Sequence, residues 1–229
     1  MNLASRIDHT ILTPEATWKE VRRVVDEALQ YGFAAVCVHG VYVARVAEAL
    51  AGSNVKTCGV AGFAGGGSTA KIKAIEAASV VRDGAKEVDF VAHLPHLLAC
   101  DVAAAEDEFQ QVVDAARSVD PQVVVKVIIE SAVLSAGVDA AQAKARIAAA
   151  CDAAAGAGCD FVKTSTGLHP AGGATVEAVR LMKKHAGSMK VKAAGGIRTF
   201  DQAMAMLDAG AHRLGCSASV AIVRDPRAR

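Results

Sequence analysis

The sequence predicts an α/β fold, a single (β/α)8 barrel (TIM barrel) that occupies residues 1–229. Short β-branched apolar runs alternate with longer Ala-rich stretches of helical spacing, and the alternation occurs eight times. The 229 residues leave about 29 residues for each βα unit, which suits such a barrel. No polar or Pro/Gly-rich linker divides the chain. The alternative is a doubly wound open sheet. Such a sheet also explains the alternation of strands and helices, but it explains the presence of eight βα units less naturally.

Local sequence patterns place the elements of this barrel. β-branched apolar runs predict strands at residues 6–11, 34–38, 55–60, 87–92, 123–130, 160–163, 190–194 and 213–216. Helical spacing of apolar residues predicts helices at residues 17–31, 41–51, 68–83, 101–118, 139–157, 174–186, 199–209 and 217–223. Ser68 and Asp139 are residue types that begin helices. Glycines, which favour helix ends, follow four of these helices, at Gly32, Gly84, Gly158 and Gly210.

Composition and charge exclude several classes of protein. The 25 Lys and Arg and 24 Asp and Glu residues give a net charge of +1, without the basic footprint of a nucleic-acid-binding protein. No run reaches the ~18 apolar residues of a membrane span, and residues 1–10 contain no apolar signal core. The six cysteines form no CxxC pair, which favours buried reduced thiols. We expect a cytoplasmic protein with no nucleic-acid and no membrane partner, either a monomer or a homo-oligomer.

Four charged residues lie within consecutive predicted strands. They are Asp89, Lys126, Lys163 and Lys192. Because side chains alternate along a strand, each can face the barrel interior while the flanking Val and Phe residues face the helices. Buried lysines are rare unless they are paired, so a purely structural explanation would need three separate ion pairs on adjacent strands. Barrel active sites lie at the C-terminal ends of the strands, and we expect the four side chains to converge there.

Two close lysines have a specific chemical use. A lysine is a nucleophile only as the free amine, and both desolvation and a neighbouring cation lower a lysine pKa from ~10.4 toward neutrality. One lysine would then form a Schiff base while the other tunes it. Asp89 would pair with a lysine or transfer protons as a general acid and base. The residues by themselves therefore predict class I aldolase chemistry.

Glycines lie at the ends of the last three predicted strands. Gly167 comes after the sixth strand, Gly195 and Gly196 come after the seventh, and Gly215-Cys216-Ser217 joins the eighth strand to a short helix. Loops at this end of a barrel commonly bind phosphate, because exposed backbone N–H groups and a helix dipole favour an anion. Tight turns also require glycine for geometric reasons, which is the competing explanation. We expect a phosphorylated substrate.

Longer motifs carry a family resemblance that covers residues 7–223. The segments DFVKTSTGLHPAGGATVE, VKAAGGIRT, VKVIIES and DGAKEVDFV resemble the deoxyribose-phosphate aldolase family. The resemblance implies a lyase that reversibly cleaves 2-deoxy-D-ribose 5-phosphate to D-glyceraldehyde 3-phosphate and acetaldehyde, in deoxyribonucleoside catabolism. It also implies that the reaction needs no metal ion and no organic cofactor.

The resemblance further implies roles for individual residues. Lys163 would form the Schiff base, and Lys192 and Asp89 would form the acid–base relay. The residues implied to bind the substrate are Lys126, in the polar network beside these catalytic residues, and four residues at the phosphate group: Gly167, Gly195, Gly196 and Ser217. Asp8 and Thr10 match the first-strand motif of the family, with a supporting role at most.

The chain departs from the family pattern at the rim of the expected pocket. His39-Gly40 stands where the family often has Asn-Pro, and residues 62–65 replace a motif that contains proline. Residues 92–101 replace a small polar segment, and Leu168 stands where some members have a phosphate-binding lysine. We expect these differences to affect which aldehydes the protein accepts and how tightly it binds a phosphate group.

Several alternatives accompany this interpretation. His93 and His96 suggest a zinc site, but Pro95 lies between them and no nearby acid completes a ligand set, which favours a pair of loop histidines. Arg198 would contact phosphate or form a surface ion pair. Two other functions remain open: a Schiff-base aldolase for another phosphorylated sugar, and a non-catalytic protein that binds sugar phosphates on this scaffold.

Overall fold

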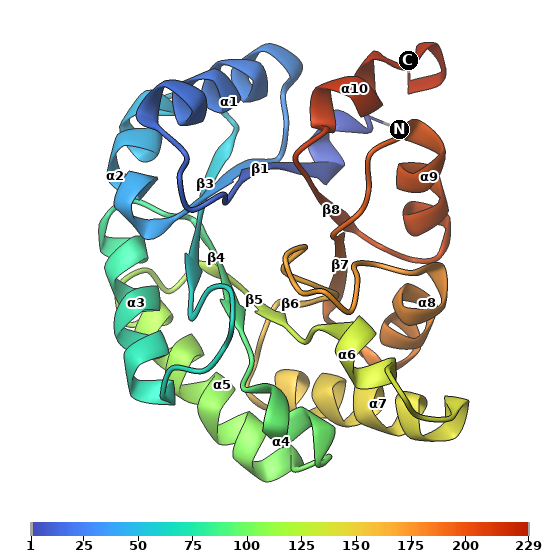
Figure 1. Ribbon diagram of the computed structural model, residues 1–229. Helices are drawn as coiled ribbons and strands as arrows, with labels where there is room; N and C mark the ends of the chain where they lie inside the picture. Colours follow the sequence, from blue (N-terminus) through green and yellow to red (C-terminus); the bar gives the residue numbers. More distant parts are fainter. Residues whose placement is uncertain (1, 229) are drawn as a thin grey trace.

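Eight parallel strands close into a barrel, and helices cover its outer surface (Figure 1). The computed structural model describes residues 2–228. Strand pairing follows chain order from β1 to β8, and β8 pairs with β1 to complete the closure. The predicted (β/α)8 barrel is therefore confirmed, and the open sheet is excluded.

The strands lie within two residues of their predicted ends, because β-branched residues pack well on a pleated surface. They are β1 (Ile7–Ile11), β2 (Ala35–Val38), β3 (Lys56–Ala61), β4 (Glu87–Val91), β5 (Val124–Ile128), β6 (Phe161–Lys163), β7 (Lys190–Ala194) and β8 (Arg213–Cys216). Short 3-10 helices lie at Ala4–Arg6 and Pro226–Ala228.

The eight predicted helices are also found within two residues of their expected ends. They are α1 (Trp18–Tyr31), α2 (Gly40–Ala49), α3 (Ala70–Arg82), α5 (Val102–Arg117), α7 (Ala140–Gly156), α8 (Val176–His185), α9 (Phe200–Asp208) and α10 (Ser219–Arg224). The expected number of helices is wrong, because α4 (Leu94–Leu98) and α6 (Ser131–Ser135) add two more. Five residues are too few to show a helical period in a sequence. Among residues 2–228, no helix has the length and apolar character needed to cross a membrane.

Capping residues explain where several helices begin and end. Asp139 caps α7 through its side chain, as predicted. The start of α3 differs from the prediction, because Thr69 and not Ser68 accepts the hydrogen bond from the backbone N–H of Ile72. Gly32 ends α1 with a φ of +67°, a left-handed conformation that glycine adopts without strain.

Side chains on the strands alternate between two environments. Val88 and Phe90 of β4 belong to the large apolar core between strands and helices, where Phe90 meets Phe109 of α5 at a ring-centroid distance of 5.4 Å. Asp89 lies between them and is buried on the opposite, inner face. A smaller apolar cluster inside the barrel comes from β2, β3 and the residue that follows β1, and consists of Leu12, Ala35, Cys37, Cys58 and Val60. This alternation turns the charged residues of β4 to β7 toward one another.

Candidate active site

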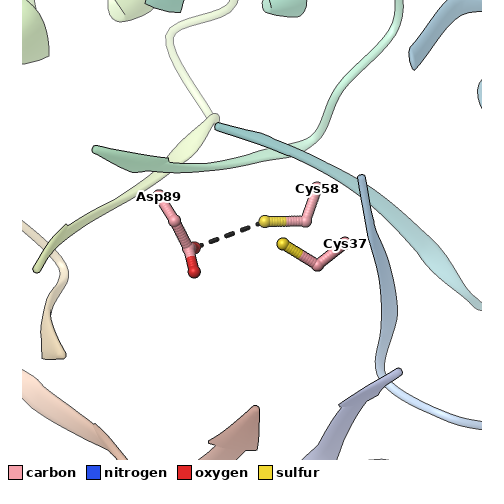
Figure 2. A group of neighbouring side chains, drawn as sticks. All are labelled: Cys37, Cys58 and Asp89. Atoms are coloured by element: carbon pink, nitrogen blue, oxygen red, sulfur yellow. Dashed lines mark hydrogen bonds between the residues drawn. The ribbon is translucent and has the colours of Figure 1, made fainter. Parts of the chain in front are cut away.

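A polar layer to which every strand contributes lies inside the barrel. Its members are Asp8 (β1), Cys37 (β2), Cys58 (β3), Glu87 and Asp89 (β4), Lys126 (β5), Lys163 (β6), Lys192 (β7) and Arg213 (β8). Register explains part of the convergence, because Asp89 is directly opposite Lys126, and Lys163 is directly opposite Lys192. Figure 2 shows that the Cys37, Cys58 and Asp89 side chains point toward one another.

Asp89 is the residue that joins the three lysines. Its Oδ1 accepts hydrogen bonds from Lys126 Nζ at 2.8 Å and from Cys58 Sγ at 3.3 Å. Its Oδ2 accepts hydrogen bonds from Lys163 Nζ and from Lys192 Nζ, both at 2.7 Å. The structure therefore brings together all four charged residues that the strand pattern singles out.

Two more carboxylates and an arginine extend these contacts into a closed circuit. Asp8 contacts both Lys192 and Arg213. Glu87 contacts Lys126 at 2.7 Å and Arg213 at 3.2 Å. Contacts of alternating charge thus run without a break through six residues, which we call the charge ring: Asp89, Lys126, Glu87, Arg213, Asp8 and Lys192. Lys163 contacts the ring through Asp89 and is not one of its members.

Burial and the opposite charges of neighbouring groups shift the pKa values of the ring residues in opposite directions. Burial by itself would raise the pKa of Asp8, but the charges of Lys192 and Arg213 outweigh it and lower this pKa to about 2. Burial likewise opposes ionisation of Asp89, yet the three lysines hold its pKa well below the usual value. Burial would lower the pKa values of Lys126 and Lys192, but the neighbouring carboxylates raise both. These residues are therefore held in their charged forms.

A cavity of about 230 Å³ opens at the C-terminal ends of β6, β7 and β8. Its lining includes Lys163, Arg198 and the predicted binding residues Gly167, Gly195, Gly196 and Ser217. Lys163 is 3% exposed, whereas Lys126 and Lys192 have no exposed surface and do not line the cavity. A molecule in the cavity can therefore reach Lys163 before it reaches either of the other two lysines.

Close packing of glycines shapes the wall of this cavity. Gly167, Gly195 and Gly196 have φ angles of +85°, +89° and +81°, where other residues are strained. A Cβ on Gly195 would lie 2.9 Å from the Cα of Gly173 and 3.1 Å from the Cα of Gly167. A Cβ on Gly173 would lie 2.2 Å from the carbonyl oxygen of Gly195. Gly173 therefore packs directly behind the lining residue Gly195 and supports the wall. The Gly-Gly pair at residues 172–173 is the sequence signal for this close approach.

Comparison with known proteins agrees with this geometry. The model of the DeoC/LacD family aldolases matches residues 3–224. This chain belongs to the DeoC/LacD aldolase family. It is 45% identical over 226 residues to the deoxyribose-phosphate aldolase of Caldanaerobacter subterraneus subsp. tengcongensis, covering 98% of this chain and 94% of that protein. It is 45% identical over 224 residues to the deoxyribose-phosphate aldolase of Enterococcus faecalis, covering 97% and 96%. The resemblance seen in the motifs is confirmed.

Solved structures give the same family. The deoxyribose phosphate aldolase from Aeropyrum pernix, described as having a unique tetrameric structure, has a TM-score of 0.87 and 35% identity, covering 98% of this chain and 91% of that one. The aldolase QR15 has a TM-score of 0.86 and 34% identity, covering 98% of this chain and 96% of that one. The barrel of this DeoC/LacD aldolase is therefore that of known aldolases.

Three members of the charge ring lie outside the site predicted for this DeoC/LacD aldolase. Asp8 is expected only to support the site, and Glu87 and Arg213 are not among the predicted residues. Glu87 lies two residues before Asp89, so the strand period places both on the same face, and this signal was available in the sequence. Arg213 is brought to Asp8 across 205 residues of sequence, which no local pattern shows.

His93 and His96 lie outside the polar layer. Their rings face each other at a centroid distance of 4.7 Å, where α4 begins. They line a separate hollow with Glu108, whose carboxylate forms a buried ion pair with Lys73. Within residues 2–228, no cluster of three metal-ligating atoms includes either histidine. The expectation of two loop histidines is therefore wrong for His96, which lies within α4, while His93 lies directly before this helix.

A cluster of three metal-ligating atoms does occur inside the barrel (Figure 2). Cys37, Cys58 and Asp89 place one ligand atom each within 4.8 Å of the others. However, both Asp89 oxygens already accept hydrogen bonds from lysines, and burial raises the pKa of Cys58 well above its usual value. A metal ion requires deprotonated thiols and would be repelled by the three ammonium groups. This cluster fits the lysine network and not a metal ion.

Proposed function

We propose that this chain is a Schiff-base aldolase that reversibly cleaves 2-deoxy-D-ribose 5-phosphate to D-glyceraldehyde 3-phosphate and acetaldehyde. The observation that carries the proposal is the position of Lys163, which lines the cavity and lies outside the charge ring. Relatives with 45% identity over nearly the whole chain are deoxyribose-phosphate aldolases, which supports this substrate. The glycine turns beside Lys163 support a phosphorylated substrate in particular.

Charge balance supports Lys163 as the nucleophile. The charge ring contains three carboxylates and three cations, so its charges cancel. Lys163 adds a fourth cation, and loss of its proton leaves the polar layer neutral with every ring contact intact. Loss of a proton from Lys126 or Lys192 would instead break the ring and leave a buried carboxylate short of a partner. Lys163 is therefore the lysine that supplies the free amine.

The reaction then follows from the positions of these groups. In cleavage, the amine of Lys163 adds to the aldehyde carbon of the open-chain sugar, and water leaves to form an imine. The C2–C3 bond breaks as the C3 hydroxyl loses its proton, the electron pair forms an enamine, and D-glyceraldehyde 3-phosphate leaves. Protonation of the enamine carbon and hydrolysis of the imine release acetaldehyde. Asp89 and Lys192 are the proposed acid–base relay, because Asp89 Oδ2 accepts hydrogen bonds from both Lys163 and Lys192 and so connects the two amines between which a proton can pass.

The phosphate group is assigned to the glycine wall of the cavity. Backbone N–H groups of Gly167, Gly195 and Gly196, together with Ser217, are the proposed donors, and Arg198 adds a cation to the same cavity. Lys126 has no exposed surface and contacts Asp89 and Glu87, so its proposed role is to hold Asp89 and not to touch the substrate.

Borohydride trapping tests the nucleophile. Reduction in the presence of acetaldehyde, followed by peptide mapping with mass spectrometry, is expected to label Lys163. Lys163→Ala is expected to lose both the label and turnover, because no imine can form. A label on Lys192 or Lys126 with Lys163 unmodified would overturn the assignment.

A cleavage assay tests the reaction and its substrate. We expect cleavage of 2-deoxy-D-ribose 5-phosphate to continue at its full rate after exhaustive chelation, since lysines supply the chemistry. Activity that is lost on chelation and restored by zinc would reject the Schiff-base mechanism. If the aldehyde is trapped on the chain but no sugar phosphate is cleaved, the chain is a binding protein and not a lyase. If only a different phosphorylated sugar is cleaved, the chain is an aldolase but the proposed substrate is wrong.

We further propose that residues 1–229 form one catalytic domain that works in the cytoplasm without a nucleic-acid partner. The net charge of +1 and the reduced thiol pattern support this setting. The Aeropyrum pernix relative is described as tetrameric, which supports a homo-oligomer here. Light scattering of the purified chain measures the oligomeric state directly.

A further inference from the structure

The charge ring extends well beyond the residues that can touch a substrate. Glu87 and Arg213 do not line the cavity, and their ion pairs are with Lys126 and Asp8. They also contact each other at 3.2 Å, and this contact closes the ring. Glu87 is buried and Arg213 is mostly buried, so water screens their charges weakly. Charges placed in this way act on the whole polar layer.

We propose that Glu87 and Arg213 are positioning residues that set the pH at which Lys163 becomes a nucleophile, by keeping the charge ring neutral so that Lys163 is the one uncompensated cation of the polar layer. The inference rests on the proposed function, in which Lys163 forms the imine. Neither residue touches the reacting atoms, so both act through the charges of their ring partners.

Two sets of charged and titratable groups surround Lys163. Inside the barrel they are the other members of the polar layer: Asp8, Cys37, Cys58, Glu87, Asp89, Lys126, Lys192 and Arg213. Toward the cavity they are Arg198, the Cys216 thiol and the buried carboxylate of Glu130, which accepts a hydrogen bond from the backbone N–H of Thr166, and none of these three is changed in the variants below. Burial raises the pKa of Cys58 well above its usual value, so this thiol adds no charge. A hydrogen bond with Cys58 lowers the pKa of Cys37. The ionisation of the Cys37 thiol is therefore measured alongside that of Lys163 in any pH series.

The proposal predicts opposite effects for two neighbouring substitutions. Glu87→Gln removes a negative charge, so the polar layer has two excess cations and Lys163 loses its proton more readily. Arg213→Gln removes a positive charge, so Lys163 becomes the cation that balances the carboxylates and keeps its proton to higher pH. A purely structural role would make both substitutions harmful in the same way, since each breaks the same ion pair.

The pH dependence of imine formation measures these effects. Purified full-length chain is mixed with acetaldehyde and borohydride for a fixed short time at each pH, and labelled Lys163 is quantified by mass spectrometry. Acetaldehyde carries no phosphate, so damage to the phosphate site does not change the result. We expect the half-maximal pH to shift down by about one unit in Glu87→Gln and up by about one unit in Arg213→Gln.

Three further variants make the test decisive. The double variant Glu87→Gln/Arg213→Gln restores neutrality, so its half-maximal pH is expected to return toward the original value even though its unfolding temperature falls. Arg213→Lys keeps the charge and is expected to keep the profile. Asp8→Asn removes another ring carboxylate and is expected to shift the profile down, which provides a second test if one of the first variants does not fold.

The matched control is Asp120→Asn, which removes a carboxylate from the exposed Lys86–Asp120 pair outside the barrel and is expected to shift nothing. Shifts of Glu87→Gln and Arg213→Gln in the same direction, or a double variant further from the original profile than either single one, would overturn the inference. A label on Lys192 or Lys126 in the unchanged chain would overturn the proposed function instead.

Discussion

Around Lys163, a single carboxylate oxygen connects the nucleophile to its neighbours. Asp89 Oδ2 accepts hydrogen bonds from Lys163 and Lys192 at the same distance of 2.7 Å. The two lysines differ in their second contacts, because Lys192 is also bound to Asp8. Two carboxylates therefore hold Lys192 in its charged form, whereas Lys163 contacts the single carboxylate of Asp89.

The substitution Lys192→Ala tests this division of labour. The charge ring would then have three carboxylates and two cations, so Lys163 would become the balancing cation and keep its proton. We expect turnover at neutral pH to fall by at least ~100-fold, and the borohydride adduct on Lys163 to recover as the pH is raised. The control is Lys190→Ala, which removes an exposed lysine from the same strand and should preserve both properties. An adduct yield that does not change with pH in Lys192→Ala would contradict this role.

At the scale of the elements, the segments after β6 and β7 form one wall of the cavity. Gly167, Gly173 and Gly195 pack backbone against backbone, at separations that leave no space for a side chain on Gly173 or Gly195. The turn that follows β6 also carries Leu168, which lines the cavity and is 52% exposed. The backbone geometry of this wall and the charge at its rim can therefore be changed separately.

Gly173→Ala changes the geometry of the wall. The new Cβ would lie 2.2 Å from the carbonyl oxygen of Gly195, so the turn after β7 must move. We expect KM for 2-deoxy-D-ribose 5-phosphate to rise by about tenfold or more, while KM for 2-deoxyribose changes little. Gly65→Ala is the control, because a Cβ at Gly65 meets no atom within 4 Å. An equal rise of KM for both sugars would mean that this wall does not bind the phosphate.

Leu168→Lys changes the charge at the rim without changing the backbone. A lysine at this exposed position adds a cation beside the proposed phosphate site, so we expect KM for the phosphorylated sugar to fall by about two- to fivefold. The effect should weaken at high salt, since exposed charges are screened. Leu168→Met serves as the uncharged control. An unchanged KM in steady-state assays at low salt would show that residue 168 points away from the phosphate.

For the whole molecule, the charge ring joins strands that are distant in sequence. Asp8 and Arg213 connect β1 to β8, and Glu87 connects β4 to both β5 and β8. These contacts cross the barrel interior, while the apolar core holds the helices against its outside. Acidification should therefore weaken the closure of the barrel before it affects the apolar core.

The free energy of unfolding is expected to fall steeply in acid. The pKa of Asp8 is about 2 in the folded chain against the usual value of 3.8, so the unfolded chain takes up a proton first as the pH falls. This stabilisation is complete above the usual value and is lost as the pH falls to about 2. For Asp8 it amounts to about 2 kcal/mol. The lowered pKa of Asp89 adds to it with the same sign.

Urea unfolding at a series of pH values measures this dependence. Asp8→Asn should be less stable at neutral pH and should lose part of the acid dependence, because it has no carboxylate to protonate. The control Asp26→Asn removes an exposed carboxylate, 56% of whose side chain is accessible, and should behave like the original chain. Identical pH dependence in the original chain and Asp8→Asn would rule out this contribution.

The amino-acid sequence by itself determined the elements and the direction of the key side chains. Strand and helix ends such as those of β7 and α7 depend on nearby residues, including the capping residue Asp139, so local patterns show them. The period of two along a strand placed Asp89 and Lys163 on the inner face. The same local reasoning failed for α4, since a five-residue helix shows no period.

Only the tertiary structure decided which charges meet. The contact between Asp8 and Arg213 spans 205 residues, and that between Glu87 and Arg213 spans 126. Such pairs form because β8 closes on β1 in a particular register, and a register is set by packing of the whole sheet and not by neighbours in the sequence. The approach of Gly173 to Gly195 has the same origin. The sequence therefore showed which strands carry the chemistry. Barrel closure determined the charge ring, in which three carboxylates balance three cations, so that Lys163 is an additional cation beside it.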